Sequence, residues 1–187
     1  MLHSFEEFNY HAEITGFRNV CFEQADAYLK ANRKTEQKVW IQFFNPDLIA
    51  TQEHLYFAVL NALTAFRGHT NLSKSLAMET MLYASSQRQI QKAIQVIGIK
   101  PDMNAMAVTI IGENVELVKA ALKDLSGYLK SEPNDAVLNL TPKKSQEIMR
   151  AFNITPKMIE VTAKNRDERA ALVDLVVEQV ALLATEL

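Results

Sequence analysis

The feature that most restricts the fold of this chain is how rarely glycine occurs and how far apart the glycines lie. The 187 residues contain five glycines, and the closest pair, Gly98 and Gly112, is 14 positions apart. A GxGxxG turn and a GxxxxGK[ST] loop both need glycines much closer together than that. The sequence therefore excludes the dinucleotide-binding and P-loop classes of nucleotide-binding protein.

Composition and charge further restrict the class of protein to which this chain can belong. Hydrophobic residues make up 48% of the chain and the net charge is −2, which suits one domain over residues 1–187 and gives no global basic field for nucleic acid. The single cysteine excludes an internal disulfide and a CxxC metal pair. The N-terminus lacks the basic start and apolar core of a secretory signal, and no apolar run reaches the length of a membrane span. We expect a cytoplasmic protein without a membrane contact.

Alternating strand and helix patterns predict a mixed α/β (α+β) domain, rich in helix, around a small central sheet. Residues 39–45 are apolar on both alternating faces, so we expect this strand to be central in the sheet. Thr51 is the expected N-cap of the helix after it, and Gly68 its end. The strands are expected at 13–20, 39–45, 104–112 and 135–140, and the helices at 21–38, 51–67, 71–84, 87–97, 113–130, 141–153, 154–163 and 167–187.

A run of five polar residues, SSQRQ at 85–89, interrupts two apolar segments. Ser86 and Gln89 have the S-x-x-Q spacing of a capping box, in which each side chain bonds the other residue's backbone N–H. The pattern predicts a helix that begins at Gln87. Its core stripe is expected to follow the i, i+3, i+4, i+7 spacing, with Ile90, Ala93, Ile94 and Ile97 facing inward.

Arg88 falls in the first turn of that expected helix, where the helix dipole disfavours a cation by a few tenths of a kcal/mol. An external phosphate opposite the guanidinium would explain its place, and Gln87 and Gln89 could read a base edge. Lys92 lies nearby in the sequence, as do His54 and Lys74. We predict a nucleic-acid-binding site made of His54, Lys74, Gln87, Arg88, Gln89 and Lys92. The alternative is a plain helix–helix junction with solvated charges.

Two stretches carry a resemblance to a known family. The pattern A-S-G-Q-R-Q-I-x-x-A-I-x-x-x-G matches residues 84–98 except for Ser86 in place of glycine, a change that should leave the capping role intact or improve it. The pattern N-A-D-x-(V/I)-A-T-x-x-H matches residues 45–54 except for Pro46. Over about 45–100 the chain closely resembles the kinase-binding subunit of the KEOPS complex, the family of the PRPK-binding protein; over 105–187 only the order of elements agrees.

The resemblance implies a non-catalytic subunit without a cofactor. KEOPS places the threonylcarbamoyl group on adenosine 37 (t6A37) of tRNAs that read ANN codons. A transferase subunit carries out that chemistry, supported by a small atypical kinase/ATPase of the Bud type. The subunit resembled here binds the kinase directly and captures the single-stranded 3′ CCA end of tRNA, and it meets the threonylcarbamoyltransferase subunit only indirectly. Arginine, amide side chains and a helix N-terminus suit such an end.

The last helix is apolar around most of its circumference, with Asp174 and Glu178 as a narrow charged edge. Such a helix is either buried inside the fold or serves the fold with one face and a partner with the other. The family likeness favours the second reading and makes this helix the kinase-docking surface. The residues expected to contact the kinase are Val176, Val180, Leu183 and Leu187.

Two rival functions remain open. Ser85 or Ser86 with His54 and Asp47 could form a site for acyl transfer, but the chain has no G-x-S-x-G elbow and no His/Cys/Asp cluster with metal-ligand spacing. We therefore expect neither catalytic residues nor a metal site. The second rival is a protein-only scaffold or regulator of the kinase that makes no direct contact with RNA.

Overall fold

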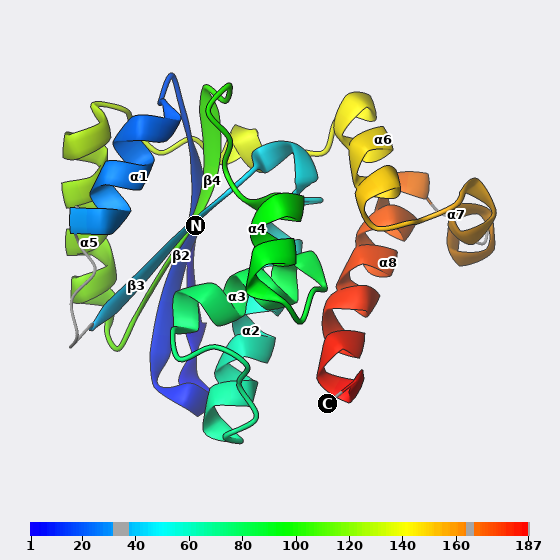
Figure 1. Cartoon of the computed structure of the whole chain (residues 1–187), viewed down its shortest axis with the longest axis horizontal. Coiled ribbons are helices and arrows are strands. Elements are labelled where there is room, and N and C mark those ends of the chain that lie inside the picture. The colour runs from blue at the N-terminus through cyan, green and yellow to red at the C-terminus, as the bar shows by residue number, and fades with distance from the viewer. Residues whose placement is uncertain (32–37, 164–166, 187) are drawn as a thin grey trace.

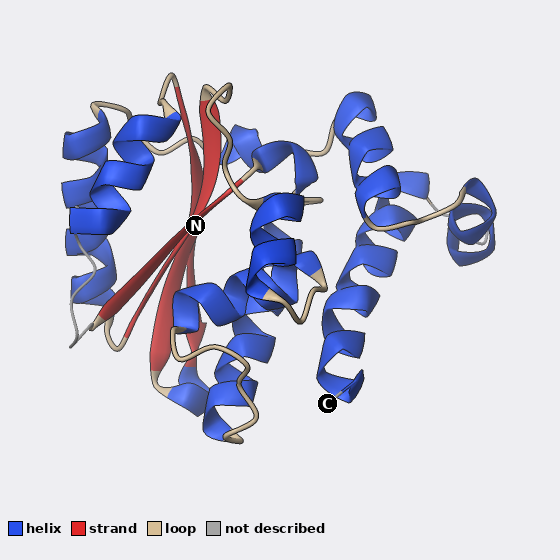
Figure 2. Cartoon of the chain, in the orientation of Figure 1, coloured by secondary structure: helices blue, strands red, loops and turns tan. Residues whose placement is uncertain are grey.

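The computed structural model describes residues 1–31, 38–163 and 167–186. Within these ranges the chain builds a mixed α+β fold, as predicted (Figures 1 and 2). The strands are β1 (Leu2–Phe5), β2 (Tyr10–Arg18), β3 (Val39–Phe44) and β4 (Ala105–Gly112). The α-helices are α1 (Phe22–Ala31), α2 (Gln52–Arg67), α3 (Leu76–Ser85), α4 (Ile90–Ile97), α5 (Val115–Leu129), α6 (Pro142–Ala151), α7 (Pro156–Ala163) and α8 (Glu168–Leu182).

The strands pair antiparallel in the order β1-β2-β4-β3. The prediction that residues 39–45 are central is therefore wrong, because β3 lies at an edge. Helices α1 and α5 cover one face of the sheet, and α2, α3 and α4 cover the other (Figure 1). The apolar pattern of β3 on both faces reflects these two helical layers rather than two neighbouring strands.

The sequence pattern failed at two further places in the sheet. Strand β1 was not predicted, and residues 135–140 form no strand. They contain the 3-10 helix η3 (Asp135–Leu138), which begins where the Asn134 side chain accepts a hydrogen bond from Ala136 N at 3.1 Å. This turn lies so close to β2 that a Cβ at Gly16 would sit 2.6 Å from Val137 Cβ. Gly16 is therefore required by close packing.

Helices α6, α7 and α8 form a third region beside α2 and α3 (Figure 1), where Leu172 and Val176 pack with Ile148 and Phe152 in a cluster of their own. Val180 and Leu183 continue from α8 into the core shared by α2, α3 and the sheet. That residues 1–187 form one domain stays a prediction. No helix among the described residues has both the length and the apolar character needed to cross a membrane.

Candidate nucleic-acid interface and partner surface

The polar run at 85–89 contains the last residue of α3, Ser85, and the link of residues 86–89 to α4. The geometry at the start of this link is that of a helix end. Gln87 N donates to Leu82 O at 3.0 Å and Ser86 N donates to Tyr83 O at 2.9 Å, while Ser86 has φ 51° and ψ 39°. These two bonds around a left-handed residue form a Schellman motif. The predicted capping box is wrong, since Ser86 terminates α3 and Gln89 is the N-cap of α4 without a side-chain cap bond.

His54 holds the end of α3 at this junction through a hydrogen bond from inside the fold. Its ring is fully buried: Nδ1 accepts a hydrogen bond from Ala50 N at 3.2 Å, and Nε2 therefore carries the proton and donates to Ala84 O at 2.8 Å. Burial lowers the pKa of His54 to about 4, so the imidazole is neutral at pH 7. The prediction that His54 contacts nucleic acid is wrong, because no part of the ring reaches the surface. It positions the end of α3 instead.

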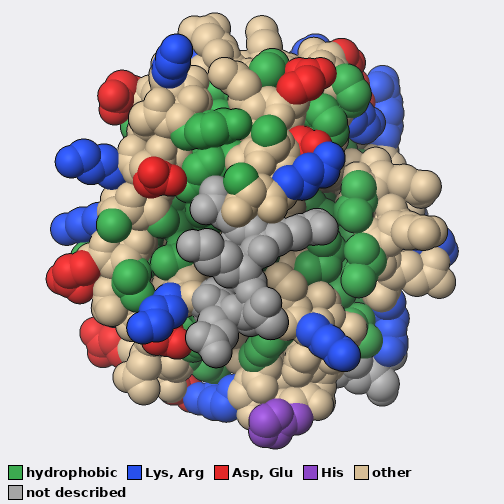
Figure 3. Space-filling view, turned by 60° about the vertical axis from the view of Figure 1, so that its left-hand side comes forward, with side chains coloured by type: hydrophobic (Ala, Val, Ile, Leu, Met, Phe, Trp, Pro, Cys, Tyr) green, Lys and Arg blue, Asp and Glu red, His purple; other side chains and the backbone are tan. Residues whose placement is uncertain are grey.

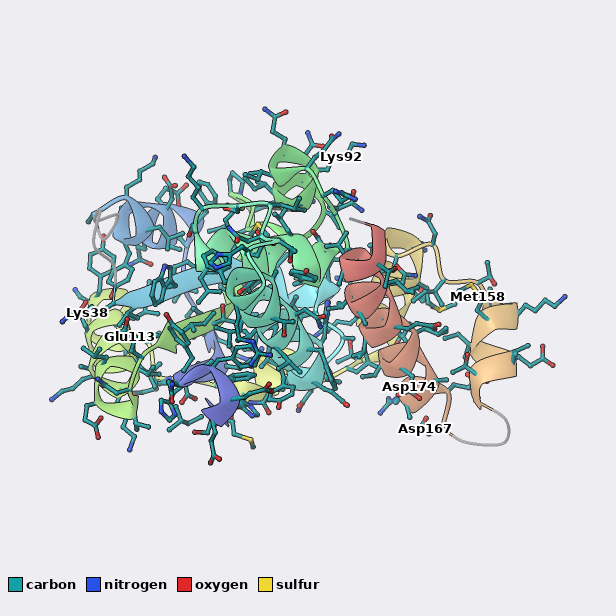
Figure 4. All side chains as sticks on the ribbon, turned by 90° about the horizontal axis from the view of Figure 1, so that it is seen from below. Lys38, Lys92, Glu113, Met158, Asp167 and Asp174 are labelled. Atoms are coloured by element: carbon teal, nitrogen blue, oxygen red, sulfur yellow. The ribbon has the colours of Figure 1, made fainter. Side chains whose placement is uncertain are left out.

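The remaining polar side chains of the junction do reach solvent. Arg88, Gln89 and Lys92 are exposed, and Gln87 is half-buried. Figure 4 shows Lys92 projecting from α4 away from the body of the molecule. Among the described residues Arg88 forms no ion pair. The first turn of α4 contains no acidic side chain, so its positive dipole end, Arg88 and Lys92 act with the same sign.

Two isoleucines extend this surface. Ala93 and Ile97 of α4 are fully buried as predicted, but Ile90 and Ile94 are 43% and 46% exposed. The predicted four-residue core stripe is therefore half wrong, because the neighbouring layer covers only one side of the apolar face of α4. We call Gln87, Arg88, Gln89, Ile90, Lys92 and Ile94 the junction surface. It combines cations, amides and apolar side chains on one short helix and the link before it.

Lys74 is exposed but lies elsewhere. It precedes the start of α3, whereas Arg88 follows the end of the same ten-residue helix. At 1.5 Å per residue, α3 separates the two by about 15 Å along its axis. Glu79, which is 1% exposed, holds the chain before Lys74 by accepting from Leu72 N at 3.1 Å and Ser73 N at 2.6 Å. The structure therefore does not bring Lys74 into the junction surface.

Three of the residues predicted to contact the kinase lie on α8 or directly after it and face inward. Val176 and Val180 are fully buried and Leu183 is 4% exposed, all within the apolar clusters described above. The prediction that these three residues contact a partner directly is therefore wrong. Leu187 lies outside the described residues. The side of α8 that faces solvent carries Asp174, Glu178 and Leu182, the last of them 48% exposed. We call these three the outer stripe of α8.

The geometry does not support acyl transfer. Both ring nitrogens of His54 bond backbone atoms, and the Ser85 hydroxyl donates to Leu82 O at 3.1 Å inside α3. No base is therefore hydrogen-bonded to Ser85, and the Ser86 hydroxyl is buried with no partner in the described structure. In the ranges that the structure describes, no group of three or more His, Cys, Asp or Glu residues is arranged to hold a metal ion.

Comparison with known proteins agrees with the resemblance seen in the sequence. A family model described as the kinase-binding protein CGI-121 matches residues 17–184. The chain is 34% identical over 113 residues to the regulatory protein Cgi121 of Methanocaldococcus jannaschii, an alignment that spans 60% of this chain and 70% of that protein. The region matched by the family model includes the link between α3 and α4 and all of α8. The chain belongs to the CGI-121 family of kinase-binding proteins.

Proposed function

We propose that this chain is the kinase-binding regulatory subunit of a KEOPS-type complex in the cytoplasm, and that it captures the single-stranded 3′ CCA end of tRNA. It carries out no chemistry itself and supports formation of N6-threonylcarbamoyladenosine at adenosine 37 by positioning the substrate. The observation that carries the RNA part is the guanidinium of Arg88, which is exposed in the link just before α4 and has no ion-pair partner among the described residues.

The junction surface has the chemistry that a single-stranded RNA end requires. Arg88 and Lys92 can pair with phosphates, and the amides of Gln87 and Gln89 can hydrogen-bond base edges that are unpaired at a single-stranded end. Ile90 and Ile94 offer apolar area to the faces of the bases. With a net charge of −2 over the whole chain, binding depends on this local cluster, which fits a short RNA segment better than a long duplex.

The kinase is proposed to dock on the outer stripe of α8. Leu182 supplies an exposed apolar anchor, and Glu178 and Asp174 lie one and two turns before it, respectively, on the same side of the helix. Figure 4 places Asp174 on α8 at the side away from α4, so the kinase and the RNA would approach different parts of the molecule. Val176, Val180 and Leu183 contribute indirectly by holding α8 in place, and Leu187 remains a proposed contact.

A gel-shift comparison tests the RNA part. The same tRNA is prepared with and without its 3′ CCA and titrated with the full chain at low ionic strength. We expect removal of CCA to weaken binding by about tenfold or more, because the contacts of the junction surface with the 3′ end are lost. A tenfold change corresponds to roughly 1.4 kcal/mol of binding free energy. Equal affinity for the two RNAs would contradict capture of the 3′ end.

A protein-only regulator of the kinase is the second candidate. It is favoured by the mixed charge of the surface: over α1 and α5, Lys and Arg side chains alternate with Asp and Glu (Figure 3). The two candidates differ in how binding responds to salt. Phosphate contacts release counterions, so our proposal predicts that tRNA affinity falls steeply between 50 and 200 mM salt, values typical of such titrations. Weak binding that does not change with salt would favour the protein-only regulator.

A further inference from the structure

A cavity of about 370 Å³ opens at the end of the sheet where β2 and β3 finish and β4 begins, the upper end in Figure 1. Its size falls in the range of small-molecule sites. The 3-10 helix η2 (Pro46–Leu48), η3 and the start of α6 close it. It shares no residue with the junction surface or with the outer stripe of α8.

Lys144 is the cation set deepest in this cavity. The residue is 5% exposed, and its Nζ donates to Val137 O at 3.2 Å. An ammonium has three protons to donate, yet the Lys144 ammonium makes no other hydrogen bond and no ion pair within the described part of the chain. Burial lowers its pKa to about 8, against the opposing effect of the Asp47 carboxylate. A buried cation with unused donors is costly unless something else accepts from it.

Asn45 lines the same cavity and also has a side-chain donor without a hydrogen-bond partner. It is 6% exposed, and its Oδ1 accepts a hydrogen bond from Asp47 N at 3.0 Å. Its side-chain NH2 group has no hydrogen-bond partner among the residues that the structure describes. Two nine-tenths-buried side chains from different elements, one before η2 and one on α6, therefore offer spare donors to one space. A ligand with acceptor oxygens would satisfy both.

The surrounding charges have the matching sign. Helix α6 begins at Pro142, which is followed at once by Lys143 and Lys144, and it has no acidic residue in its first turn. The helix dipole disfavours this arrangement unless an anion is close. Arg18 and Lys143 lie exposed at the rim with Asp47 and Asp102. The lining therefore carries three cationic and two acidic side chains, which is an excess of positive charge. The buried cation among them is Lys144.

We propose that this cavity binds a phosphate group carried by a nucleotide-sized ligand, with Lys144 and Asn45 donating to the phosphate oxygens. The ligand is either a free mononucleotide or a nucleotide of an RNA chain, since both present the same phosphate chemistry. The site stands apart from the proposed capture of tRNA by Arg88. Sequence reasoning did not single out Lys144; the available signal was the pair of lysines directly after the Thr141–Pro142 helix start.

Calorimetric titration of the full chain tests the site with four probes: AMP, inorganic phosphate, adenosine and a short oligonucleotide ending in CCA. We expect AMP to bind and adenosine to bind about tenfold more weakly or not at all. Lys144→Met and Asn45→Asp should each weaken AMP binding about tenfold; the Asp keeps the acceptor for Asp47 N and replaces the free donor with an anionic oxygen. Lys123→Met, an exposed lysine of α5, is the matched control and should leave AMP binding unchanged.

Thermal unfolding of the variants separates binding from folding. Lys144→Met should have an unchanged or higher Tm, because the change removes an incompletely paired buried charge. Binding of AMP identifies a free nucleotide, whereas Lys144-dependent binding of the oligonucleotide alone assigns the phosphate to RNA; either supports the site. Equal affinity for AMP and adenosine, no binding of the phosphate-bearing probes, or unchanged binding by folded Lys144→Met would overturn it. Arg88→Glu should bind AMP normally, so failure of one proposal does not imply failure of the other.

Discussion

Ser86 leaves α3 in a left-handed conformation with φ 51°, and its hydroxyl is buried without a partner among the described residues. The S-x-x-Q spacing suggested a helix start there, although the same residue ends a helix. The usable signal was the glycine that the family pattern has at this position, since glycine is the residue that a left-handed helix end favours. The serine is therefore no improvement on the glycine.

Ser86→Gly should stabilise the protein by about 0.5–1 kcal/mol. Relief of the left-handed strain and removal of the unpaired buried hydroxyl outweigh the greater freedom of glycine in the unfolded chain. Urea unfolding at constant pH measures the change, with Ser85→Gly inside α3 as the control that should destabilise. A loss of stability in Ser86→Gly would show that the serine makes a contact that this account lacks.

His54 should make the stability of the protein depend on pH. Its pKa is lowered by burial from 6.5 to about 4. Between these two pH values His54 is therefore protonated in the unfolded chain and neutral in the folded chain. The contribution of neutral His54 to the free energy of unfolding is fully present above about pH 6.5 and is lost as the pH falls toward 4. The total loss is on the order of 3 kcal/mol. Urea unfolding between pH 7.5 and 4.5, a range set by these pKa values, should show a steeper acid loss in the wild type than in His54→Gln. Parallel curves for the two proteins would contradict a neutral buried His54.

Helix α8 shows what periodicity can and cannot tell at the scale of an element. Its length and its apolar character all round were visible in the sequence, and burial on most sides was one of the two open readings. The choice of contact residues failed, because α8 is covered by α2 on one side and by α6 and α7 on others. Which side stays open depends on how distant elements pack, and the pattern of one helix does not contain that information.

Val180→Glu should therefore unfold or strongly destabilise the protein, by about 3 kcal/mol or more, because it places a charge in a fully buried position. Leu182→Glu should leave the Tm almost unchanged and reduce co-purification with the kinase. Circular dichroism melting and a pull-down of the kinase measure the two effects, with Tyr128→Glu on α5 as an exposed control. A stable Val180→Glu protein, or full kinase binding by Leu182→Glu, would contradict the assignment of the inner and outer sides.

The strands show the same limit of prediction from a local sequence pattern. The sequence pattern of β3 correctly predicted a strand covered on both faces, yet the pattern does not encode the order of strands, and β3 proved to be an edge. Residues 135–140 were expected to form a strand, but Val137 and Leu138 are both buried in successive positions of η3. A short apolar run does not distinguish an extended segment from a tight turn packed against a sheet.

At the scale of the whole molecule, the fold separates the three regions for which we propose functions, although the sequence interleaves them. The junction surface lies on the helical layer over one face of the sheet, the outer stripe of α8 belongs to the third region, and the cavity proposed to bind phosphate opens at the end of the sheet. The sequence revealed the family and the cationic junction, because those depend on residues close together in the chain. It did not reveal the cavity, whose lining comes from segments as far apart as Arg18 and Lys144.

The binding of tRNA by Arg88→Glu tests the central claim most directly. Arg88 is exposed and unpaired within the described structure, so the variant should keep the wild-type Tm and kinase binding. Its affinity for intact tRNA should fall by about tenfold or more at low salt, while Lys123→Glu, which makes the same charge change on α5, should bind nearly as the wild type does. If Arg88→Glu binds intact tRNA as tightly as Lys123→Glu, the junction surface does not hold the RNA and the account is contradicted.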